Sequence, residues 1–381
     1  MRIALLTYST KPRGGVVHTL ALAEALAASG HDVTVGTLGR GGDAVFFRAV
    51  DPRVTMQVVP FPDASPDETV GERIVRSIEA LRAGLDLSGF DVVHAQDCIS
   101  SNACDGAVRT VHHLDTFTTT QLVACHDRAV REPAALVCVS RSVAAEVMAS
   151  YDRSATVIPN GVDAARFTDA ASDSPTAAAA RAAWTDRLGR YVLAVGGIEP
   201  RKGTIDLLRA YDLLRTRGHD DVALVLAGGE TLFDYRPYRA EFDALVRERG
   251  IPVTELGVVD DPSLPALVAG AAAFSFVSTK EGFGLAAMEA LAAGVPVVAR
   301  DLPVLREVFG DTVAFAGDVD GIADALGSAL HDPVDPLAGR ALAASYSWSA
   351  AAAAHVELYG RLLDRSGGAP VGRVRSDAVP A

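Results

Sequence analysis

Residues 272–298, AAFSFVSTKEGFGLAAMEALAAGVPVV, decide the fold of this chain. They begin with a β-rich apolar run, AAFSFVS, which predicts a buried strand. A glycine turn at Gly282, Phe283 and Gly284 then leads into an Ala/Leu-rich stretch that predicts a helix to Ala293. The next apolar run, VPVV, predicts another strand. A strand, a helix and a second strand in this order are typical of a parallel sheet covered by helices.

The same alternation runs through both halves of the chain. Strand-like runs such as IALLTY, DVTVGTL and DVVHA mark the first half, and YVLAVGG starts a second series after a small, polar stretch. We therefore predict an α/β fold with two Rossmann-like, doubly wound domains that face each other across a central cleft. The expected parts are an N-terminal domain (1–165), a linker (166–189), a C-terminal domain (190–345), a final helix (346–365) and a disordered tail (366–381).

Composition narrows the classes of function. The chain has 381 residues, 49% of them apolar, and a net charge of −13, so a general nucleic-acid binder or a binder of anionic membranes is not expected. The four cysteines show no CxxC pair or zinc-ribbon spacing, which favours reduced, buried thiols. Without a signal peptide or a membrane-spanning run, the sequence predicts a cytoplasmic protein. Its oligomeric state is not readable.

The turn at 281–285 carries the sharpest candidate site. Backbone amides of Gly282, Phe283, Gly284 and Leu285 at the start of the predicted helix would bind an anion. Glu281 precedes the helix and Glu289 lies inside it, and each carboxylate can accept two hydrogen bonds from a vicinal diol. A diphosphate flanked by two diol-binding carboxylates matches a nucleotide sugar. The alternative is a loop glutamate and an ordinary solvent-facing helix glutamate.

Three further segments follow predicted strands. Arg201 and Lys202, in VGGIEPRKG, could clamp a diphosphate, or could form a solvated helix start. Gly14 and Gly15, in TKPRGGVVHTL, could bring backbone close to an anion, or form an ordinary tight turn. The run TVHHLDTF places His112, His113 and Asp115 at a strand end, where they could contact sugar hydroxyls, act as acid or base, or be structural. No third ligand supports a metal site there.

Together and in this order, these motifs resemble the family-4 retaining glycosyltransferases of the GT-B fold (glycosyltransferase group 1). The most specific piece is the pair Glu281 and Glu289 within EGFGLAAMEALAAGVPVV, and VIPNGVD at 157–163 is a second strong match. The resemblance covers nearly the whole chain. It implies an N-terminal acceptor domain, a C-terminal domain that binds the nucleotide-sugar donor, and a final helix that crosses back to the first domain.

The resemblance also implies individual roles. Glu281 would contact the donor sugar, Glu289 the ribose diol, and Lys202 the diphosphate, with Arg201 beside it. His112 would lie near the reacting carbon, so His112, Glu281 and Lys202 form the predicted catalytic set. The backbone at Gly14 and Gly15 would approach the phosphate or the acceptor, which His113 and Asp115 could help to select.

One position departs from the family pattern: Gly197 stands where an Arg is common, which puts the detailed diphosphate clamp in doubt. We expect transfer of a sugar to a hydroxyl of a small-molecule or glycan acceptor, with no cofactor and no metal. No acidic metal-binding DxD run is evident at a strand end. The alternatives are a sugar-nucleotide epimerase or a phosphorylase on the same fold, and a non-catalytic carbohydrate-binding protein. The nucleotide base, the sugar and the acceptor are not readable.

Overall fold

The computed structural model describes residues 1–63, 65, 67–117, 119–229, 235–333 and 335–375. The chain forms two compact α/β units, unit 1 from Met1–Gly161 and Trp348–Ala381, and unit 2 from Val162–Ser347. Among the described residues, no helix is both long enough and apolar enough to cross a lipid bilayer.

Unit 1 is built on a seven-stranded sheet with the order β3-β2-β1-β4-β6-β7-β8, in which every pairing is parallel. The order reverses beside β1, which is the switch point where ligands of open α/β sheets gather. The strands are β1 (Arg2–Leu6), β2 (Asp32–Arg40), β3 (Val54–Phe61), β4 (Val92–Ala95), β6 (Val108–Val111), β7 (Ala135–Cys138) and β8 (Thr156–Val157).

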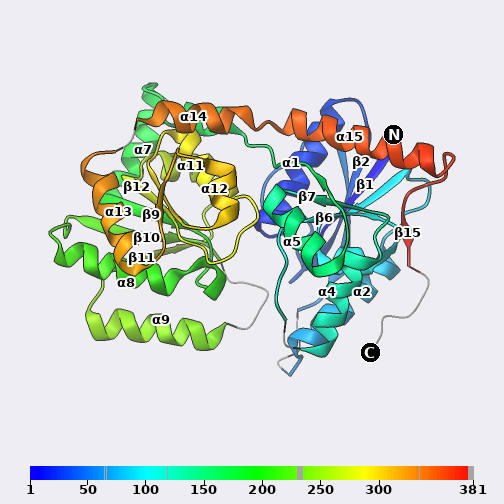
Figure 1. Cartoon of the computed structure of the whole chain (residues 1–381), viewed down its shortest axis with the longest axis horizontal. Helices are drawn as coiled ribbons and strands as arrows, with labels where there is room; N and C mark the ends of the chain where they lie inside the picture. The colour runs from blue at the N-terminus through cyan, green and yellow to red at the C-terminus, as the bar shows by residue number, and fades with distance from the viewer. Residues whose placement is uncertain (64, 66, 118, 230–234, 334, 376–381) are drawn as a thin grey trace. The chain divides into compact units, whose positions relative to one another are not determined.

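Helices cover both faces of this sheet. Helix α1 packs with α15 (Figure 1), while α2, α3, α4 and α5 form a second group in which each helix contacts the next. The central strands β1 and β4 are buried on both faces, which explains why they read as continuous apolar runs rather than as alternating ones. The helices are α1 (Gly14–Ala28), α2 (Val70–Gly84), α3 (Cys98–Asn102), α4 (Thr120–Arg131), α5 (Arg141–Tyr151) and α15 (Trp348–Arg365).

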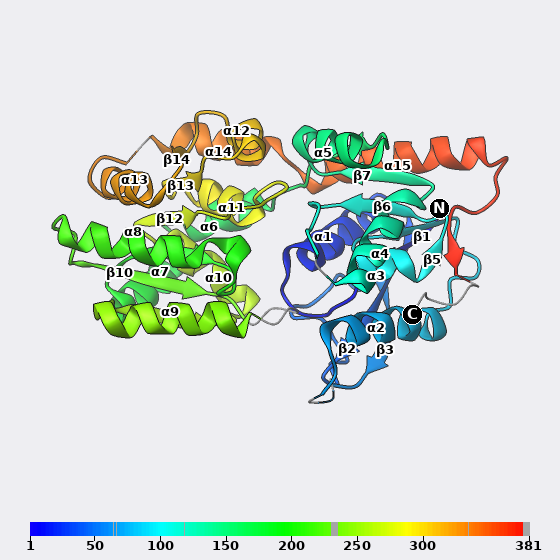
Figure 2. The same ribbon diagram turned by 60° about the horizontal axis from the view of Figure 1, so that its bottom comes forward.

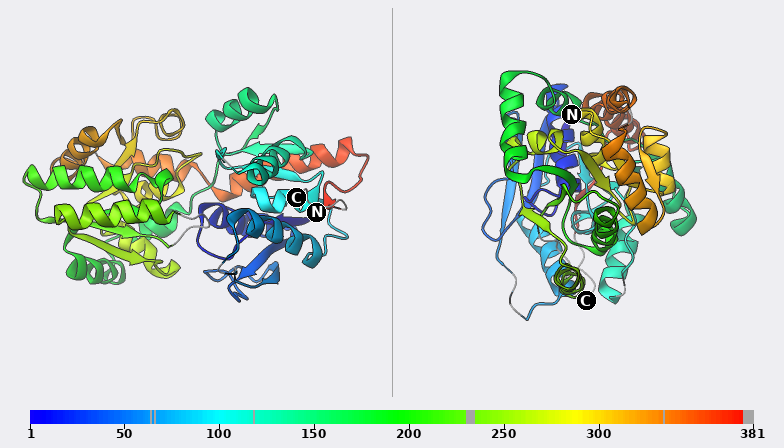
Figure 3. Two further views of the ribbon diagram at one scale, coloured as in Figure 1. Left: turned by 90° about the horizontal axis from the view of Figure 1, so that it is seen from below. Right: turned by 90° about the vertical axis from the view of Figure 1, so that its left-hand side faces the viewer.

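Unit 2 repeats this plan with a six-stranded parallel sheet in the order β11-β10-β9-β12-β13-β14. The order reverses between β9 and β12. Helix α13 (orange) packs on α8 (green) along one face, while α6, α10, α11 and α14 contact one another (Figure 3). The strands are β9 (Arg190–Val195), β10 (Val222–Ala227), β11 (Val253–Gly257), β12 (Ala273–Phe276), β13 (Val297–Arg300) and β14 (Ala314–Ala316).

The remaining elements of unit 2 are helical. Two short 3-10 turns, η1 (Pro200–Lys202) and η2 (Asp261–Ser263), lie at strand ends. The α-helices are α6 (Ala164–Ala170), α7 (Pro175–Leu188), α8 (Thr204–Thr216), α9 (Arg236–Arg249), α10 (Leu264–Ala269), α11 (Leu285–Ala293), α12 (Pro303–Phe309), α13 (Val319–His331) and α14 (Pro336–Ser345). The two sheets show the predicted α/β fold of two Rossmann-like domains.

The segment 166–189 is not the linker that its composition suggested. It forms most of α6 and all of α7, and both helices pack within unit 2. Phe167 anchors α6 because its side chain is 1% exposed. Helix α7 has no fully buried residue, which is why its sequence shows no apolar face. The stretch has a helical composition, but without an apolar face its sequence does not show that it packs within unit 2.

The tail was expected to be disordered, and residues 366–375 depart from this expectation. Strand β15 (Arg373–Val374) pairs antiparallel with β5 (Cys104–Asp105) at the edge of unit 1 (Figure 2). Arg375 is 9% exposed and forms ion pairs with Asp105, at 3.1 Å, and with Glu132. Residues 376–381 lie outside the described part of the chain. All four cysteines are free thiols, and three of them are buried.

Candidate active site

Lys202 and Glu281 meet at the carboxyl edge of the unit 2 sheet. Lys202 ends η1, which follows β9, and Glu281 lies in the turn between β12 and α11. Since β9 and β12 are neighbours in the sheet, their loops lie side by side. The Nζ of Lys202 donates to Oε1 of Glu281 at 2.6 Å, and the two side chains are 20% and 11% exposed. This contact joins two of the predicted catalytic residues.

Arg201 contacts the same carboxylate oxygen. Its NH1 lies 3.1 Å from Oε1 of Glu281, and its NH2 lies 3.1 Å from Oε1 of Glu199. Two cations therefore converge on one oxygen of Glu281, while Glu199 fixes the other side of the guanidinium. A partly buried cluster of this kind is held in place by its own hydrogen bonds and does not have to reorganise when charge develops nearby.

The turn before α11 depends on Gly284. Its φ of 103° is left-handed, and a Cβ at this position would come within 2.8 Å of the Phe309 ring. Phe283 is 3% exposed and packs edge-on against Tyr346, with ring centroids 5.2 Å apart. The side chain of Phe283 is therefore part of the core, and only its backbone can serve a ligand. Helix α11 begins at Leu285 without a side-chain cap, which leaves its first amides available to an anion.

Glu289 lies within α11, eight positions after Glu281. It is partly exposed on α11, and burial raises its pKa to about 8, with smaller contributions from Asp261 and Asp163. Arg166, which pairs with Asp261 at 2.9 Å, opposes the increase. At neutral pH the carboxyl group is mainly protonated, so it can donate one hydrogen bond and accept others.

Gly197, where the family pattern has an Arg, lies in a tightly packed backbone. A Cβ on Gly228 would come within 2.2 Å of the Gly196 carbonyl carbon and 2.7 Å of the Gly197 nitrogen. The stem of Lys202 packs on Gly196, within 3.2 Å of a Cβ built there. A cavity of about 20 Å³ beside Lys202 is also lined by Gly196, Gly197 and Ser275. The cations of this site therefore come from Arg201 and Lys202.

The unit 1 candidates gather at the carboxyl edge of its own sheet. Gly14 and Gly15 open α1, and His112 follows β6. A Cβ on Gly15 would lie 3.7 Å from the His112 ring, so the predicted loop and the predicted histidine are in contact. His18, one turn further along α1, packs edge-on against His112 with ring centroids 4.8 Å apart.

His112 is a neutral imidazole at physiological pH. Burial lowers its pKa to about 3, with further contributions from His113 and Arg109. Its Nε2 is buried without a hydrogen-bond partner among the described residues. A neutral imidazole can donate or accept a hydrogen bond, but it does not serve as an acid near pH 7.

His113 and Asp115 pair with each other. Nε2 of His113 lies 3.1 Å from Oδ1 of Asp115, and the side chains are 25% and 39% exposed. No group of three His, Cys, Asp or Glu side chains in the described ranges is arranged as metal ligands. The pair stays a candidate for acceptor contacts.

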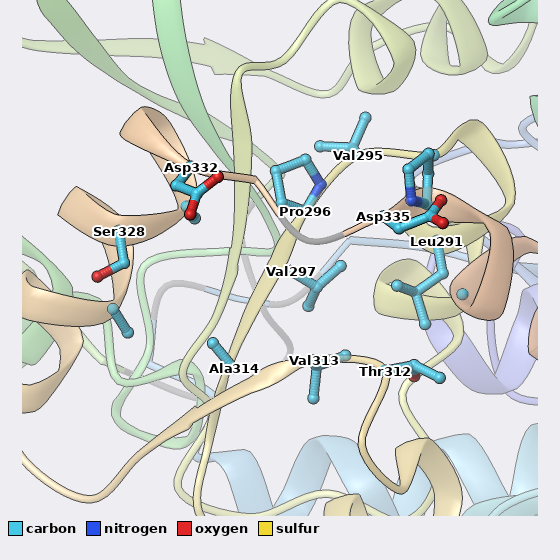
Figure 4. Close-up of a pocket in the computed structure, with 15 residues that line it drawn as sticks. Leu291, Val295, Pro296, Val297, Thr312, Val313, Ala314, Ser328, Asp332 and Asp335 are labelled. Carbon is cyan, nitrogen blue, oxygen red and sulfur yellow. The ribbon is translucent and has the colours of Figure 1, made fainter.

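The larger cavity of unit 2 lies away from these residues. It measures about 80 Å³ and is lined mainly by small apolar side chains around the amino ends of β13 and β14, including Val295, Val297 and Val313 (Figure 4). Asp332 and Asp335 also line it (Figure 4). The cavity includes none of the predicted site residues, which lie at the opposite, carboxyl ends of the strands.

Sequence reasoning missed three residues that support the site. Glu199 orients Arg201, His18 packs on His112, and Oδ1 of Asn160 accepts a hydrogen bond from Nδ1 of His18 at 2.8 Å. His18 and Asn160 both lie in quoted motifs, TKPRGGVVHTL and VIPNGVD. Their separation of 142 residues gave no sign that they touch.

Comparisons with known proteins identify the family of the chain. A model described as "Glycosyltransferase Family 4" matches residues 12–166, and one described as "Glycosyl transferases group 1" matches residues 185–347. A D-inositol 3-phosphate glycosyltransferase from Pseudarthrobacter chlorophenolicus is 30% identical over 415 residues and 96% of each chain. An O-antigen chain mannosyltransferase B from Escherichia coli is 37% identical over 167 residues, 42% of each chain.

Solved structures support the fold. Sucrose-phosphate synthase from Thermosynechococcus elongatus superposes with a TM-score of 0.76 at 22% identity, covering 96% of this chain and 99% of that one. Anabaena HepE in complex with UDP-glucose has a TM-score of 0.69 at 18% identity, covering 96% and 100%. The match at 30% identity over 96% of the chain and the two family models establish the family of the chain. The chain is a group 1 glycosyltransferase of the family 4 type, with the GT-B fold.

Proposed function

We propose that this enzyme transfers a sugar from a nucleotide diphosphate sugar to an acceptor hydroxyl, with retention of anomeric configuration. The observation that carries the proposal is the convergence of Lys202 and Arg201 on Glu281 beside the uncapped start of α11. A diphosphate and a sugar need these two kinds of group next to each other, cations for one and a carboxylate for the other.

The chemical role of the cations follows from charge. Negative charge grows on the diphosphate as the glycosidic bond breaks, and an oxocarbenium-like centre forms on the sugar. Lys202, Arg201 and the amides of the α11 start would stabilise the leaving group, and Glu281 would hold the sugar hydroxyls. Glu289 would hold the ribose diol. The family resemblance is the support for retention.

The unit 1 residues would contact both the donor and the acceptor. His112 would donate or accept a hydrogen bond near the reacting carbon as a neutral ring, and the backbone at Gly14 and Gly15 would approach the phosphate or the acceptor. His113 and Asp115 would contact the acceptor. We expect no metal requirement and no cofactor, and the cytoplasm as the place of action stays a prediction.

The donor is the first quantity to measure. We expect one member of a panel of nucleotides and nucleotide sugars to stabilise the protein in a thermal-shift assay. A donor at 100 times its Kd should add about 2.7 kcal/mol to the free energy of unfolding. No response to any member of a broad panel would count against the proposal.

Variants then test the residues. With a donor in hand, Lys202→Ala and Glu281→Ala should each lower kcat/KM by roughly 10² to 10³, as expected for groups that stabilise developing charge. Lys280→Ala, at the neighbouring lysine, is the matched control and should stay within threefold of wild type. Near wild-type rates in both site variants would contradict the assigned roles.

Product analysis separates the alternatives. Proton NMR of the glycoside reports its anomeric configuration and therefore tests retention. An epimerase would convert the nucleotide sugar with no acceptor present, which the same spectrum detects. A non-catalytic carbohydrate-binding protein would shift the melting temperature with a sugar and release no nucleotide.

A further inference from the structure

A cluster of arginines lies at the carboxyl edge of the unit 1 sheet, although the chain as a whole carries a net charge of −13. Arg40 ends β2, Arg73 lies on α2, and Arg13 immediately precedes α1. Arg73 and Arg13 both lie close enough to Arg40 to lower its pKa, to which burial makes the largest contribution. Like charges are gathered here at an electrostatic cost, so a compensating anion is expected.

Arg40 is held rigidly by the protein. Its Nε donates to the Tyr8 carbonyl at 3.0 Å, and its NH2 donates to Oγ of Ser77 at 2.8 Å. Its guanidinium also lies 4.7 Å from the centre of the Phe61 ring. All three partners are neutral groups. The N–H groups of Arg40 NH1 have no hydrogen-bond partner in the described ranges.

Arg73 has no comparable structural role. It lies one turn before Ser77 on α2, and Oγ of Ser77 donates to its carbonyl at 2.6 Å. Its side chain forms no ion pair among the residues that the structure describes, and its Nε is buried without an acceptor. A buried, unpaired guanidinium donor costs free energy that a bound anion would recover.

Nearby carboxylates are already engaged. Glu68 pairs with Arg76 at 2.6 Å, and Asp43 pairs with Lys11 at 2.8 Å. Asp97, which raises the pKa of Arg40, caps α3 by accepting from the Ser100 amide at 2.8 Å. Arg73 and Arg40 lie close enough to Glu68 to lower its pKa as well, but its hydrogen-bonded ion pair is with Arg76. The cluster is therefore more basic than its surroundings, Arg40 is held by its hydrogen bonds, and both Arg40 and Arg73 are partly exposed.

We propose that Arg40 and Arg73, with Arg13, bind a phosphate ester carried by the acceptor. This inference rests on the proposed function, because it assigns the substrate class of its acceptor. A phosphate ester carries close to two negative charges near pH 7 and presents three oxygens to planar guanidinium forks. The phosphate would hold the acceptor in unit 1 and leave its hydroxyls for transfer.

The first experiment measures anion binding by itself. The protein is the full chain with Lys202→Ala, which removes one of the two cations of the donor site and so lowers its contribution to phosphate binding. Sodium phosphate, compared with sodium chloride at equal ionic strength, should raise its melting temperature. Adding Arg73→Gln should weaken phosphate binding about tenfold or more. Adding Arg53→Gln, which removes an exposed arginine paired with Asp51, should leave it within twofold.

The outcomes are distinct from those of the donor assay. Nucleotide binding with no phosphate effect, or equal phosphate effects with and without Arg73, would overturn the inference and leave the proposed function intact. Phosphate binding that depends on Arg73 without any nucleotide response would support the anion site and contradict the proposed function. Because Arg40→Gln also breaks two structural contacts, Arg73→Gln is the decisive variant.

The source of the phosphate is decided by competition. Glucose 6-phosphate should protect the protein at concentrations where glucose does not. Vesicles with and without a phosphorylated inositol lipid are the second arm. Protection by either phosphorylated form that depends on Arg73 supports the inference and identifies a free or a lipid-linked ester. Equal protection by glucose and glucose 6-phosphate, with no effect of the vesicles, would refute it.

Discussion

At the scale of single residues, two glutamates of one motif take different protonation states. Glu281 accepts hydrogen bonds from Lys202 and Arg201, which favour its ionised form. Glu289, eight positions later, is desolvated near Asp261 and Asp163, which favour its neutral form. The two carboxyl groups therefore suit different tasks, one beside charge and one beside a neutral diol.

The raised pKa of Glu289 makes stability depend on pH. An unfolded glutamate titrates near 4.5 and the folded one near 8, so between these values the folded state binds more protons. Its contribution is complete below pH 4.5 and is lost as pH rises towards 8, by up to about 1.4 kcal/mol per pH unit. Glu289→Gln should remove this decline.

Thermal or urea unfolding of both proteins from pH 5 to 8.5 checks this prediction. The difference between Glu289→Gln and wild type should grow in favour of the variant as pH rises. Parallel pH profiles would show that Glu289 titrates normally in the folded protein. Glu79→Gln, on an exposed position of α2, is the control for loss of one carboxylate.

At the scale of elements, glycines decide where helices can start. Gly284 combines a left-handed φ of 103° with a Cβ position 2.8 Å from Phe309, so Gly284→Ala should destabilise unit 2 by roughly 1–3 kcal/mol.

Gly360, inside α15, has no neighbour within 4 Å of its Cβ position. Gly360→Ala should instead stabilise the protein by about 0.5–1 kcal/mol. Denaturant unfolding of both variants measures the contrast, and equal effects would argue against this account.

Helix α15 brings another titrating residue into unit 1. His355 is fully buried, with its ring 5.5 Å from that of His94, 5.9 Å from that of Tyr359 and 6.5 Å from that of His18. Burial lowers the pKa of His355 to about 4, and it lowers the pKa values of His18 and His94 well below their usual value. The α15 contact with α1 therefore requires neutral histidines.

Acid should weaken this part of the fold. Between pH 6.5 and 4 the unfolded state binds the proton of His355 and the folded state does not, so stability falls as pH decreases, by up to about 1.4 kcal/mol per pH unit. His355→Phe keeps an aromatic ring and should reduce the loss of melting temperature between pH 7 and 5. An unchanged acid profile would mean that His18 and His94 dominate the effect.

At the scale of the whole molecule, we predict that the charge distribution supplies what a metal ion would otherwise supply in the proposed reaction. Cations in unit 2 and helix-start amides supply the positive charge that a divalent ion would otherwise provide. Transfer activity should therefore persist in 5 mM EDTA at a rate within about twofold of the untreated enzyme, because no step needs a Lewis acid. Loss of activity that Mg²⁺ or Mn²⁺ restores would show the opposite.

Local patterns in the sequence predict the two α/β halves and nominate the candidate residues of the site. Strand runs and glycine turns are local signals, and the stretch EGFGLAAMEALAAGVPVV contains both glutamates within nine positions. The features that the sequence does not predict are those without a local signal. Helices α6 and α7 lack an apolar stripe and were read as a linker, and the pairing of β15 with β5 joins segments almost 270 residues apart.

Which side chains meet, and in which state of charge, depends on the tertiary structure. It placed Arg201 and Lys202 on one oxygen of Glu281, raised the pKa of Glu289, and packed His18 on His112. It also gathered Arg40 and Arg73 from different elements of an acidic chain. Contacts and pKa values arise from distance and desolvation between residues far apart along the chain, and sequence spacing carries neither quantity.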